Sequence, residues 1–214
     1  ACAPFRRLHL CHHNLETIET TSTTTNKLLA EVCLAAKFEA ESLIRDHPQH
    51  QGTNEGTASQ LCTVLARSFA DIGDIVRGRD IFRGNDKEKD QRKKLEKNLK
   101  TIFGNIYKEL KRVDKTKEAE KHYKDGAPEF YKLREDWWAL NRETVWKALT
   151  CDDDNKLAGA SYFRPTCNSG DNRGGAQANN QCRCPKTSDG KPNDQVPTYF
   201  DYVPQYLRWF EEWA

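Results

Sequence analysis

The chain has 214 residues, enough for one large domain or two small ones, and its 34 Lys/Arg against 32 Asp/Glu leave a net charge of only +2. This balance excludes a polycation, and the low hydrophobic content of 36% predicts long helices with wide solvated faces around a sparse core. No apolar run approaches 18 residues, so no transmembrane helix is predicted and membrane attachment is expected outside this segment.

Eight cysteines are many for a chain of this size. They favour disulfides in an extracellular or exported protein over a cytosolic metal or redox site. The first of them fall in residues 1–14, a short basic segment predicted to form a loop or turn element held by Cys2 and Cys11. Residues 20–25 are a Thr/Ser run, predicted to be a linker or the lead-in to a helix.

The first long helix is predicted to be capped by Thr25 or Asn26 and to end before Pro48. Residues 47–59, rich in polar residues and glycine, are predicted to be a flexible loop. The apolar stripe that supports the helix consists of Leu28, Leu29, Val32, Ala36 and Leu43.

A second helix is predicted over residues 59–76. Gly73 lies inside it, which indicates close packing or a bend, and Gly78 is predicted to end it. Its apolar residues repeat at spacings of three and four, at Leu61, Leu65, Phe69, Ile72 and Val76.

The clearest helical pattern covers residues 86–113. Nearly every position outside its apolar stripe is charged, as expected for a helix with one face on a core. The stripe consists of Leu95, Leu99, Ile102, Phe103, Ile106, Leu110 and Val113.

A helix with three tryptophans is predicted over residues 130–151, opened by a break at residues 126–128 with Pro128 in its first turn. Its apolar positions cover so wide an arc that the helix should be a central core element, covered on more than one side. One predicted face carries Leu133, Trp137, Leu140 and Thr144, and the adjoining face carries Trp138, Val145 and Leu149, with Trp146 as the third tryptophan.

Residues 152–197 are rich in Gly, Asn, Asp, Ser and Pro and are predicted to be irregular, exposed and ordered mainly by disulfides. A last helix is predicted after Pro204, and no strand is predicted anywhere. The fold class is therefore all-α, a disulfide-stapled helical bundle with long irregular loops. The cysteines expected in disulfides are Cys2, Cys11, Cys33, Cys62, Cys151, Cys167, Cys182 and Cys184.

Positive charge is concentrated in residues 83–124, which hold fifteen Lys/Arg and eight Asp/Glu. Two interpretations are open: a solvated helix face with Glu/Lys pairs, or a face that binds a sulfated glycan or an acidic receptor. The lack of interleaved aromatics argues against nucleic acid. The candidate binding residues are Lys87, Lys89, Arg92, Lys93, Lys94, Lys97 and Lys100, with Arg77, Arg79 and Arg83, and also Arg6 and Arg7, as possible extensions of the patch.

Other chemistry finds little support. The spacing of His9, Cys11, His12 and His13 does not match a paired zinc motif, and the acidic run at residues 152–154 is more typical of a solvated loop end than of a calcium site. Cys182-Arg-Cys184 is interpreted as two disulfide anchors. No catalytic or phosphate-binding motif occurs, so the sequence predicts no enzyme, no metal and no cofactor.

Four blocks, CAPFRRLHLC at residues 2–11, ARSFADIGDIVRGRDIF at 66–82, REDWWALNRETVWKALTC at 134–151 and PTYFDYVPQYLRWFEEW at 197–213, closely resemble the Duffy-binding-like domain. The match is to the alpha type at the head of the variant erythrocyte membrane proteins of Plasmodium falciparum. The blocks cover about a third of the chain in the family's order. The resemblance implies a helical fold, with residues 1–25 as the end of subdomain 1 and a linker, residues 26–214 as subdomain 2 with its cysteine-rich loop 151–197, and subdomain 3 absent.

The resemblance also implies disulfides. Cys62 is expected to pair with Cys182 or Cys184. Cys33, Cys151, Cys167 and the remaining cysteine are expected to close two more bridges of unassigned connectivity. The partners of Cys2 and Cys11 would lie upstream, so these two residues are expected to be bonded to each other or unpaired.

The function implied is host-cell adhesion on the extracellular face of the infected erythrocyte membrane, with antigenic variation. The expected partners are host glycans (sulfated glycans such as heparan sulfate, or blood-group sugars), a glycoprotein receptor such as complement receptor one, host antibodies and adjacent domains of the same adhesin, and no nucleic acid. The alternative is a structural domain of the adhesin head that leaves receptor binding to its neighbours. The tryptophans of residues 130–151 are expected to be scaffold.

Overall fold

The computed structural model describes residues 2–214 except 22–23, 52–60, 115, 124–128, 152–155, 169–174, 188, 192 and 194, and for residues 47–51 it describes the backbone only. Among the described residues the regular structure is helical, without strands, and two isolated bridges join Cys167 to Ala176 and Asn180 to Arg183. The helices are α1 (Phe5–Leu8), α2 (His13–Glu16), α3 (Thr25–Gln51), α4 (Leu61–Arg77), α5 (Asp86–Val113), α6 (Glu118–His122), α7 (Tyr131–Leu149), the 3₁₀ turn η1 (Phe200–Tyr202) and α8 (Gln205–Trp213).

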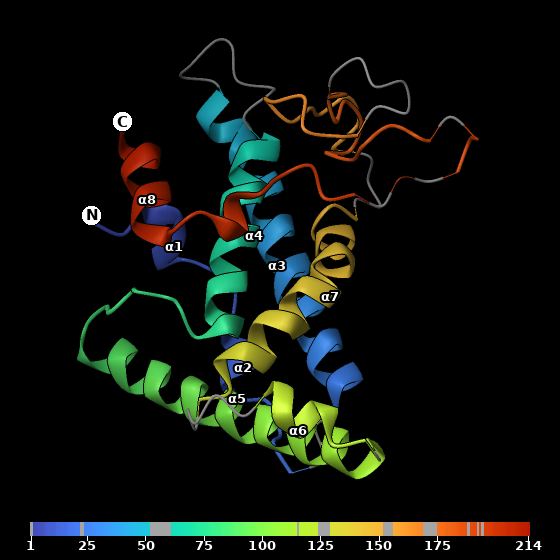
Figure 1. Cartoon of the computed structure of the whole chain (residues 1–214). Helices are drawn as coiled ribbons and strands as arrows, with labels where there is room; N and C mark the ends of the chain where they lie inside the picture. Colours follow the sequence, from blue (N-terminus) through green and yellow to red (C-terminus); the bar gives the residue numbers. More distant parts are fainter. Residues whose placement is uncertain are drawn as a thin grey trace.

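Helices α3, α4 and α7 pack against one another and form the centre of the molecule (Figure 1). Helix α5 lies across one end of these three, and the cysteine-rich segment after α7 lies at the other end. Helices α1 and α8 flank α4, so the two chain ends come close together. None of the described helices is long and apolar enough to cross a membrane.

Helix α4 is buried along its whole length, more completely than its single predicted stripe required. It can be enclosed because α3, α7, η1 and α8 all pack on it. Gly73 serves close packing: a Cβ built there would lie 2.7 Å from Cζ2 of Trp138. Gly78 ends the helix as predicted, with a left-handed φ of 73°.

The bounds predicted for α5, residues 86–113, are confirmed. Its start is fixed by a capping box between Asn85 and Glu88. Its stripe is buried from Leu95 to Ile106, but Leu110 is exposed and Val113 is 72% exposed. The prediction that these last two residues face the core is wrong.

Helix α7 is the central element that the sequence predicted. Trp137, Trp138 and Trp146 are all buried, and Trp138 and Trp146 flank Phe69 of α4 at centroid distances of 5.1 and 5.2 Å. Two positions were wrongly placed in the core: Leu140 is 80% exposed and Thr144 is also exposed. The buried arc is therefore centred on the adjoining face of the helix.

The predicted starts and ends of two helices are corrected. Helix α7 begins at Tyr131, after the left-handed residue Phe130. Pro128, predicted in its first turn, lies outside the described residues. Helix α3 continues through Pro48 to Gln51. A proline in the last turn removes only its own backbone donor, which the helix tolerates more readily there than in its middle. The rest of the predicted flexible loop, residues 52–59, lies outside the described residues.

The N-terminal segment forms α1 and α2 rather than a loop held by cysteines. Cys2 and Cys11 carry free thiols. The segment is instead held by packing and by polar contacts, because Leu10 and Leu15 are buried in the core and the backbone N–H of Cys11 donates to Glu39 of α3.

Two disulfides are present among the described residues. Cys62 is bonded to Cys182, one of the two pairings that the resemblance implied, and Cys167 is bonded to Cys184. The expectation of a further bridge through Cys33 is wrong, because Cys33 is a free thiol. Its Sγ lies 4.0 Å from the carbonyl oxygen of Thr144. Thr144 precedes Cys151 by about 10 Å of helical rise, too far for a bridge from this position.

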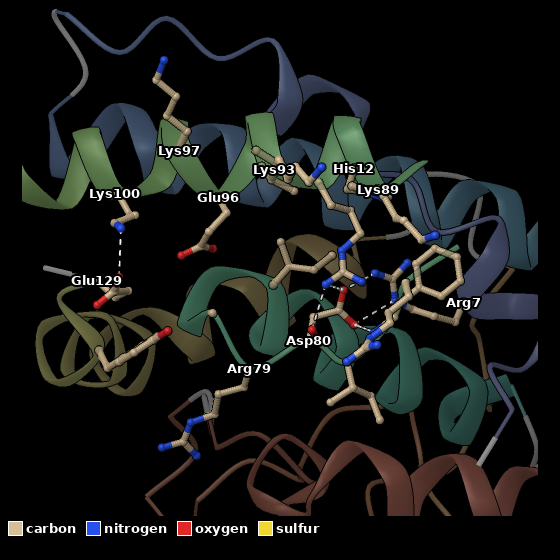
Figure 2. A pocket seen from close by; sticks show the side chains of 18 of the residues that line it. Arg7, His12, Arg79, Asp80, Lys89, Lys93, Glu96, Lys97, Lys100 and Glu129 are labelled. Atoms are coloured by element: carbon tan, nitrogen blue, oxygen red, sulfur yellow. Dashed lines mark hydrogen bonds and ion pairs between the residues drawn. The ribbon is translucent and has the colours of Figure 1, made fainter. Parts of the chain in front are cut away.

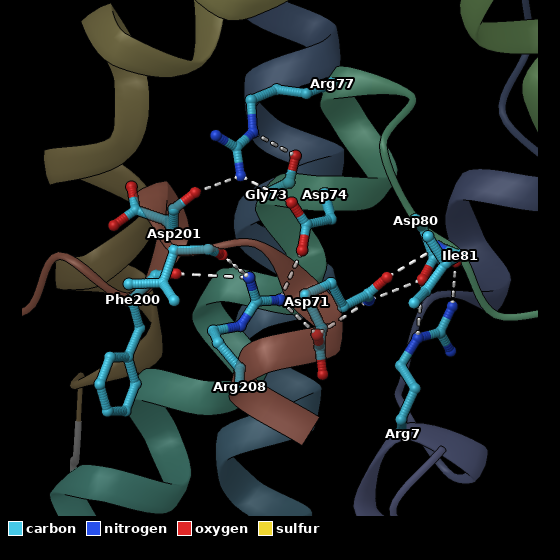
Figure 3. A network of polar contacts seen from close by, with 12 residues as sticks. Arg7, Asp71, Gly73, Asp74, Arg77, Asp80, Ile81, Phe200, Asp201 and Arg208 are labelled. Carbon is cyan, nitrogen blue, oxygen red and sulfur yellow. Dashed lines mark hydrogen bonds and ion pairs between the residues drawn. The ribbon is translucent and has the colours of Figure 1, made fainter. Parts of the chain in front are cut away.

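A network of buried charges ties α8 and η1 to α4 (Figure 3). Arg208 of α8 donates to both Asp71 and Asp74, and Arg77 donates to Asp74 and to the carbonyl oxygen of Asp201. Because both partners of each pair are almost fully buried, removing one would leave an uncompensated charge in the core. The C-terminal helix is therefore positioned by charge as well as by packing.

Candidate functional site: a basic groove beside α5

A groove of about 1030 Å³ lies between α5, the segment that follows α4, and the start of α7 (Figure 2). Eight Lys/Arg and three Asp/Glu line it. Its basic residues are Arg7, Arg79, Arg83, Lys89, Arg92, Lys93, Lys97 and Lys100, its acidic residues are Asp80, Glu96 and Glu129, and its apolar lining includes Ile75, Ile81, Phe82, Leu95 and Tyr131.

Helical geometry divides the cations of α5 into two sets. Lys89, Lys93 and Lys100 are four and seven residues apart and therefore lie on one side of the helix, the side that borders the groove. Lys87 and Lys94 lie on the solvent side and do not line the groove. This division provides two sets of like charges on one helix, of which only the first has a concave surface beside it.

The opposite bank of the groove is built by the turn that ends α4. A Cβ on Gly78 would lie 2.9 Å from the guanidinium of Arg134, and the residue has a positive φ. Both features favour glycine at this position of the turn. The chain then runs along the groove, where it places Arg79 and Arg83 opposite the lysines of α5. Glu135 forms an ion pair with Arg79 at 2.6 Å, which helps to orient the Arg79 side chain.

Asp80 holds the inner end of the groove together. Its carboxylate accepts hydrogen bonds from Arg7 at 2.5 Å and from Gln205 at 2.8 Å, and it forms an ion pair with Arg92 at 3.0 Å. The two guanidinium groups lie over the ring of Phe82, at 4.5 and 5.7 Å from its centroid. One carboxylate thus faces two arginines, and the inner end keeps a net positive charge.

The electrostatics follow from this packing. Burial lowers the pKa of Arg92, and Asp80 opposes that shift. Burial and the neighbouring Arg7 lower the pKa of His12, so this residue adds no positive charge to the groove at neutral pH. The remaining acids are already paired, Glu96 with Arg134 and Glu129 with Lys100 at 2.9 Å.

Seven of the ten principal candidate residues line the groove. The prediction that Arg77 contributes to the binding surface is wrong. Arg77 is only 1% exposed, and its guanidinium donates to Asp74 and to the carbonyl oxygen of Asp201, so it is not accessible to a ligand. Arg6 is likewise bound, to Asp71 and Glu212, and lines no part of the groove. Basic sequence alone could not separate these structural arginines from exposed ones.

Sequence reasoning missed the roles of Asp80, Tyr131 and Glu129 in this site. A single acid inside a basic segment gives no pattern, and Tyr131 joins the groove only because α7 starts beside α5. Of the metal sites weighed from the sequence, residues 152–154 lie outside the described residues. Among those that the structure describes, no group of three His, Cys, Asp or Glu side chains could hold a metal ion.

The comparisons with known proteins agree with the helical architecture. The family model of the Duffy binding domain matches residues 1–208 of this chain. The NTS-DBL1(alpha-1) domain of Plasmodium falciparum membrane protein 1 (PfEMP1) from the varO strain is 45% identical, with a TM-score of 0.73, and the match covers 100% of this chain and 43% of that chain. A search of curated protein sequences found no match.

Two more distant structures share the fold. A PfEMP1 DBLbeta domain described as ICAM-1-binding is 33% identical over 97% of this chain and 41% of its own, with a TM-score of 0.64. Plasmodium falciparum Erythrocyte Binding Antigen 140 is 22% identical over 98% of this chain and 24% of its own, with a TM-score of 0.52, which supports the fold alone. The chain spans less than half the length of each of these structures.

Proposed function

Because the chain belongs to the Duffy binding domain family, we propose that it is a host-cell adhesion domain, displayed at the surface of the infected erythrocyte as part of a PfEMP1-type adhesin. Its ligands would be anionic receptors on erythrocytes or endothelium, with sulfated glycans such as heparan sulfate foremost and blood-group sugars or complement receptor one as further receptors. Cytoadherence and rosetting would be the outcome. The observation that carries this proposal is the basic groove beside α5.

The groove suits an anionic receptor for a physical reason. A single exposed ion pair contributes about 0–1 kcal/mol, so useful affinity needs several cations that engage one ligand together. The groove supplies them from α5 and from the segment after α4, on both sides of one concave surface. Arginine and lysine also donate charge-assisted hydrogen bonds to sulfate or carboxylate oxygens.

The test compares two double variants on a heparin column. Lys89→Glu/Lys93→Glu reverses two charges that line the groove, and Lys87→Glu/Lys94→Glu reverses two on the solvent side of the same helix. All four side chains are exposed, so both variants should fold. The groove variant is expected to elute at clearly lower salt than its control. Equal loss in both would mean that only overall charge matters, and unchanged elution would place the site elsewhere.

A second candidate function, packing within the adhesin head, is favoured by the exposed face of α8. Tyr206, Leu207, Phe210 and Trp213 are all at least 45% exposed on this short helix. An apolar surface of this kind is typical of contact with another protein surface. Direct binding of the isolated domain to erythrocytes separates the two functions, since a domain that only packs against its neighbours would not bind.

A further inference from the structure

We propose that the groove beside α5 binds an extended acidic polypeptide segment, with acidic side chains at the Arg83 end and an apolar side chain at the Tyr131 end. This inference rests on the proposed function, whose site it shares. It names a class of ligand different from the sulfated glycans considered above, and it follows from the way charge and apolar surface change along the groove.

Charge is uneven along the groove. At one end Arg83 has no ion-pair partner among the described residues, and Lys89 and Lys93 pair only with exposed acids one turn away on their own helix, at 2.8 and 3.2 Å. Such surface pairs are weak and exchange readily with a ligand. This end therefore offers three cations to an incoming anion.

The other end is less positive, because Lys97, one turn before Lys100, adds a single exposed cation to the lining there. There Lys100 is bound to Glu129 across the groove (Figure 2), and the lining also includes Tyr131 and Thr101. Lys89 and Lys100 are eleven residues apart on α5, so about 16 Å of helix separates the two ends. A ligand that spans the groove meets three available cations at the Arg83 end and then a less positive surface with hydroxyl groups at the Tyr131 end.

Exposed apolar surface is available at both ends. Ile81 is 48% exposed beside Arg83, and Tyr131 is 44% exposed beside Lys100. Phe82 and Leu95, by contrast, are buried beneath the groove and offer little surface. Between the ends lies Glu96, whose carboxylate is held in an ion pair by Arg134.

These features favour a chain of mixed chemistry over a uniformly sulfated one. A uniform polyanion would engage the cations but would leave the exposed faces of Ile81 and Tyr131 without a suitable partner. A polypeptide can change from acidic to apolar residues within a few positions. At about 3.3 Å per extended residue, about five residues cover the 16 Å between the two ends.

Fluorescence anisotropy with three labelled ten-residue peptides tests this inference on the whole domain. The block peptide has acidic residues in one half and leucine with neutral residues in the other. The second has the same composition with the acids dispersed, and the third is all glutamate. The block peptide is expected to bind at least tenfold more tightly than the dispersed one.

Variants assign the two ends. Arg83→Glu/Lys89→Glu is expected to weaken the block peptide at least tenfold, and Tyr131→Ala about threefold, while Tyr131→Ala leaves binding of the all-glutamate peptide unchanged. Lys87→Glu/Lys94→Glu, outside the groove, is the control and is expected to change block-peptide binding less than threefold. All of the altered side chains are exposed.

The outcomes separate this inference from the proposed function. If the all-glutamate peptide binds as tightly as the block peptide, the polypeptide inference is overturned. If no peptide binds while heparin retention still depends on Lys89 and Lys93, the polypeptide inference is overturned and glycan binding is supported. If neither peptide nor heparin depends on the groove residues, both proposals fall.

Discussion

Gly73 of α4 and Trp138 of α7 meet so closely that a Cβ on the glycine would lie 2.7 Å from Cζ2 and 2.8 Å from Cε2 of the indole. The indole cannot retreat, because it is fully buried, packs on Phe69 and donates from Nε1 to Asp201 at 2.9 Å. The contact fixes the distance between the two central helices, and with it the positions of the groove-forming segments that follow α4 and precede α7.

Gly73→Ala is therefore expected to destabilise the domain by up to about 2 kcal/mol, since overpacking at about 1–3 kcal/mol opposes the gain of about 1 kcal/mol in helix propensity. Gly104→Ala in α5 is the matched control, because a Cβ there would meet Phe130 at an ordinary 3.4 Å. Urea unfolding measures both. Equal stability changes for the two variants would mean that α4 and α7 are not in this close contact.

Trp137→Ala is expected to cost about 3–5 kcal/mol, because its ring is buried and packs edge-on against Phe103. Leu140→Ala, three residues later on the exposed side of the same helix, should cost a few tenths of a kcal/mol. Denaturant midpoints of the two variants give the comparison. A small effect at Trp137 would argue against its role as scaffold and reopen it as a contact residue.

Asp74 is expected to shape the pH dependence of stability. Burial raises its pKa to about 6 despite Arg208 and Arg77, above the value near 3.9 in an unfolded chain. The folded state then holds this proton more tightly, so the contribution of Asp74 to stability falls as pH rises from 4 to 6, by about 2–3 kcal/mol.

Asp74→Asn removes that titration. The free energy of unfolding of the wild type, minus that of the variant, is expected to fall between pH 4 and pH 6.5, whatever constant offset the substitution adds. Asp71 works in the opposite sense: burial alone would raise its pKa, but Arg6 and Arg208 outweigh burial and lower it, so its contribution to stability is lost only in stronger acid. A pH-independent difference would show that Asp74 titrates normally.

Loss of the Cys62–Cys182 disulfide should cost more than loss of Cys167–Cys184, because the bridges close segments of 120 and 17 residues. Loop-closure entropy gives about 4–5 and about 3 kcal/mol. Alanine pairs at the two bridges, unfolded in urea, provide the measurement. Non-reducing peptide mapping is an independent check, and a free Cys62 would contradict the pairing.

Helix periodicity predicted much of this fold because the long helices each bury one side on a common core. The bounds of α5 were predicted from its apolar stripe and charge pattern, and the end of α4 from Gly78. The Asn85–Glu88 capping box, which the structure shows, explains why α5 starts where it does. Exposure of Leu140 and Val113 could not be predicted, because a periodic apolar residue marks a face but not whether another element covers it.

The groove was predictable only in part. Sequence counts identified the cations of α5, and the resemblance identified the kind of protein, but neither could show that Lys89 borders a cavity while Lys87 does not. That difference depends on where the segment after α4 returns beside α5. Arg77 shows the converse limit, since a basic residue next to a basic patch can be wholly structural.

The most direct test of the account is binding of the isolated domain to uninfected human erythrocytes, measured by flow cytometry for the wild type and the two double variants of α5. The account predicts that the wild type and Lys87→Glu/Lys94→Glu bind alike and that Lys89→Glu/Lys93→Glu loses at least tenfold in apparent affinity. Equal binding of all three proteins, or no binding by any of them, would contradict a receptor site in the groove.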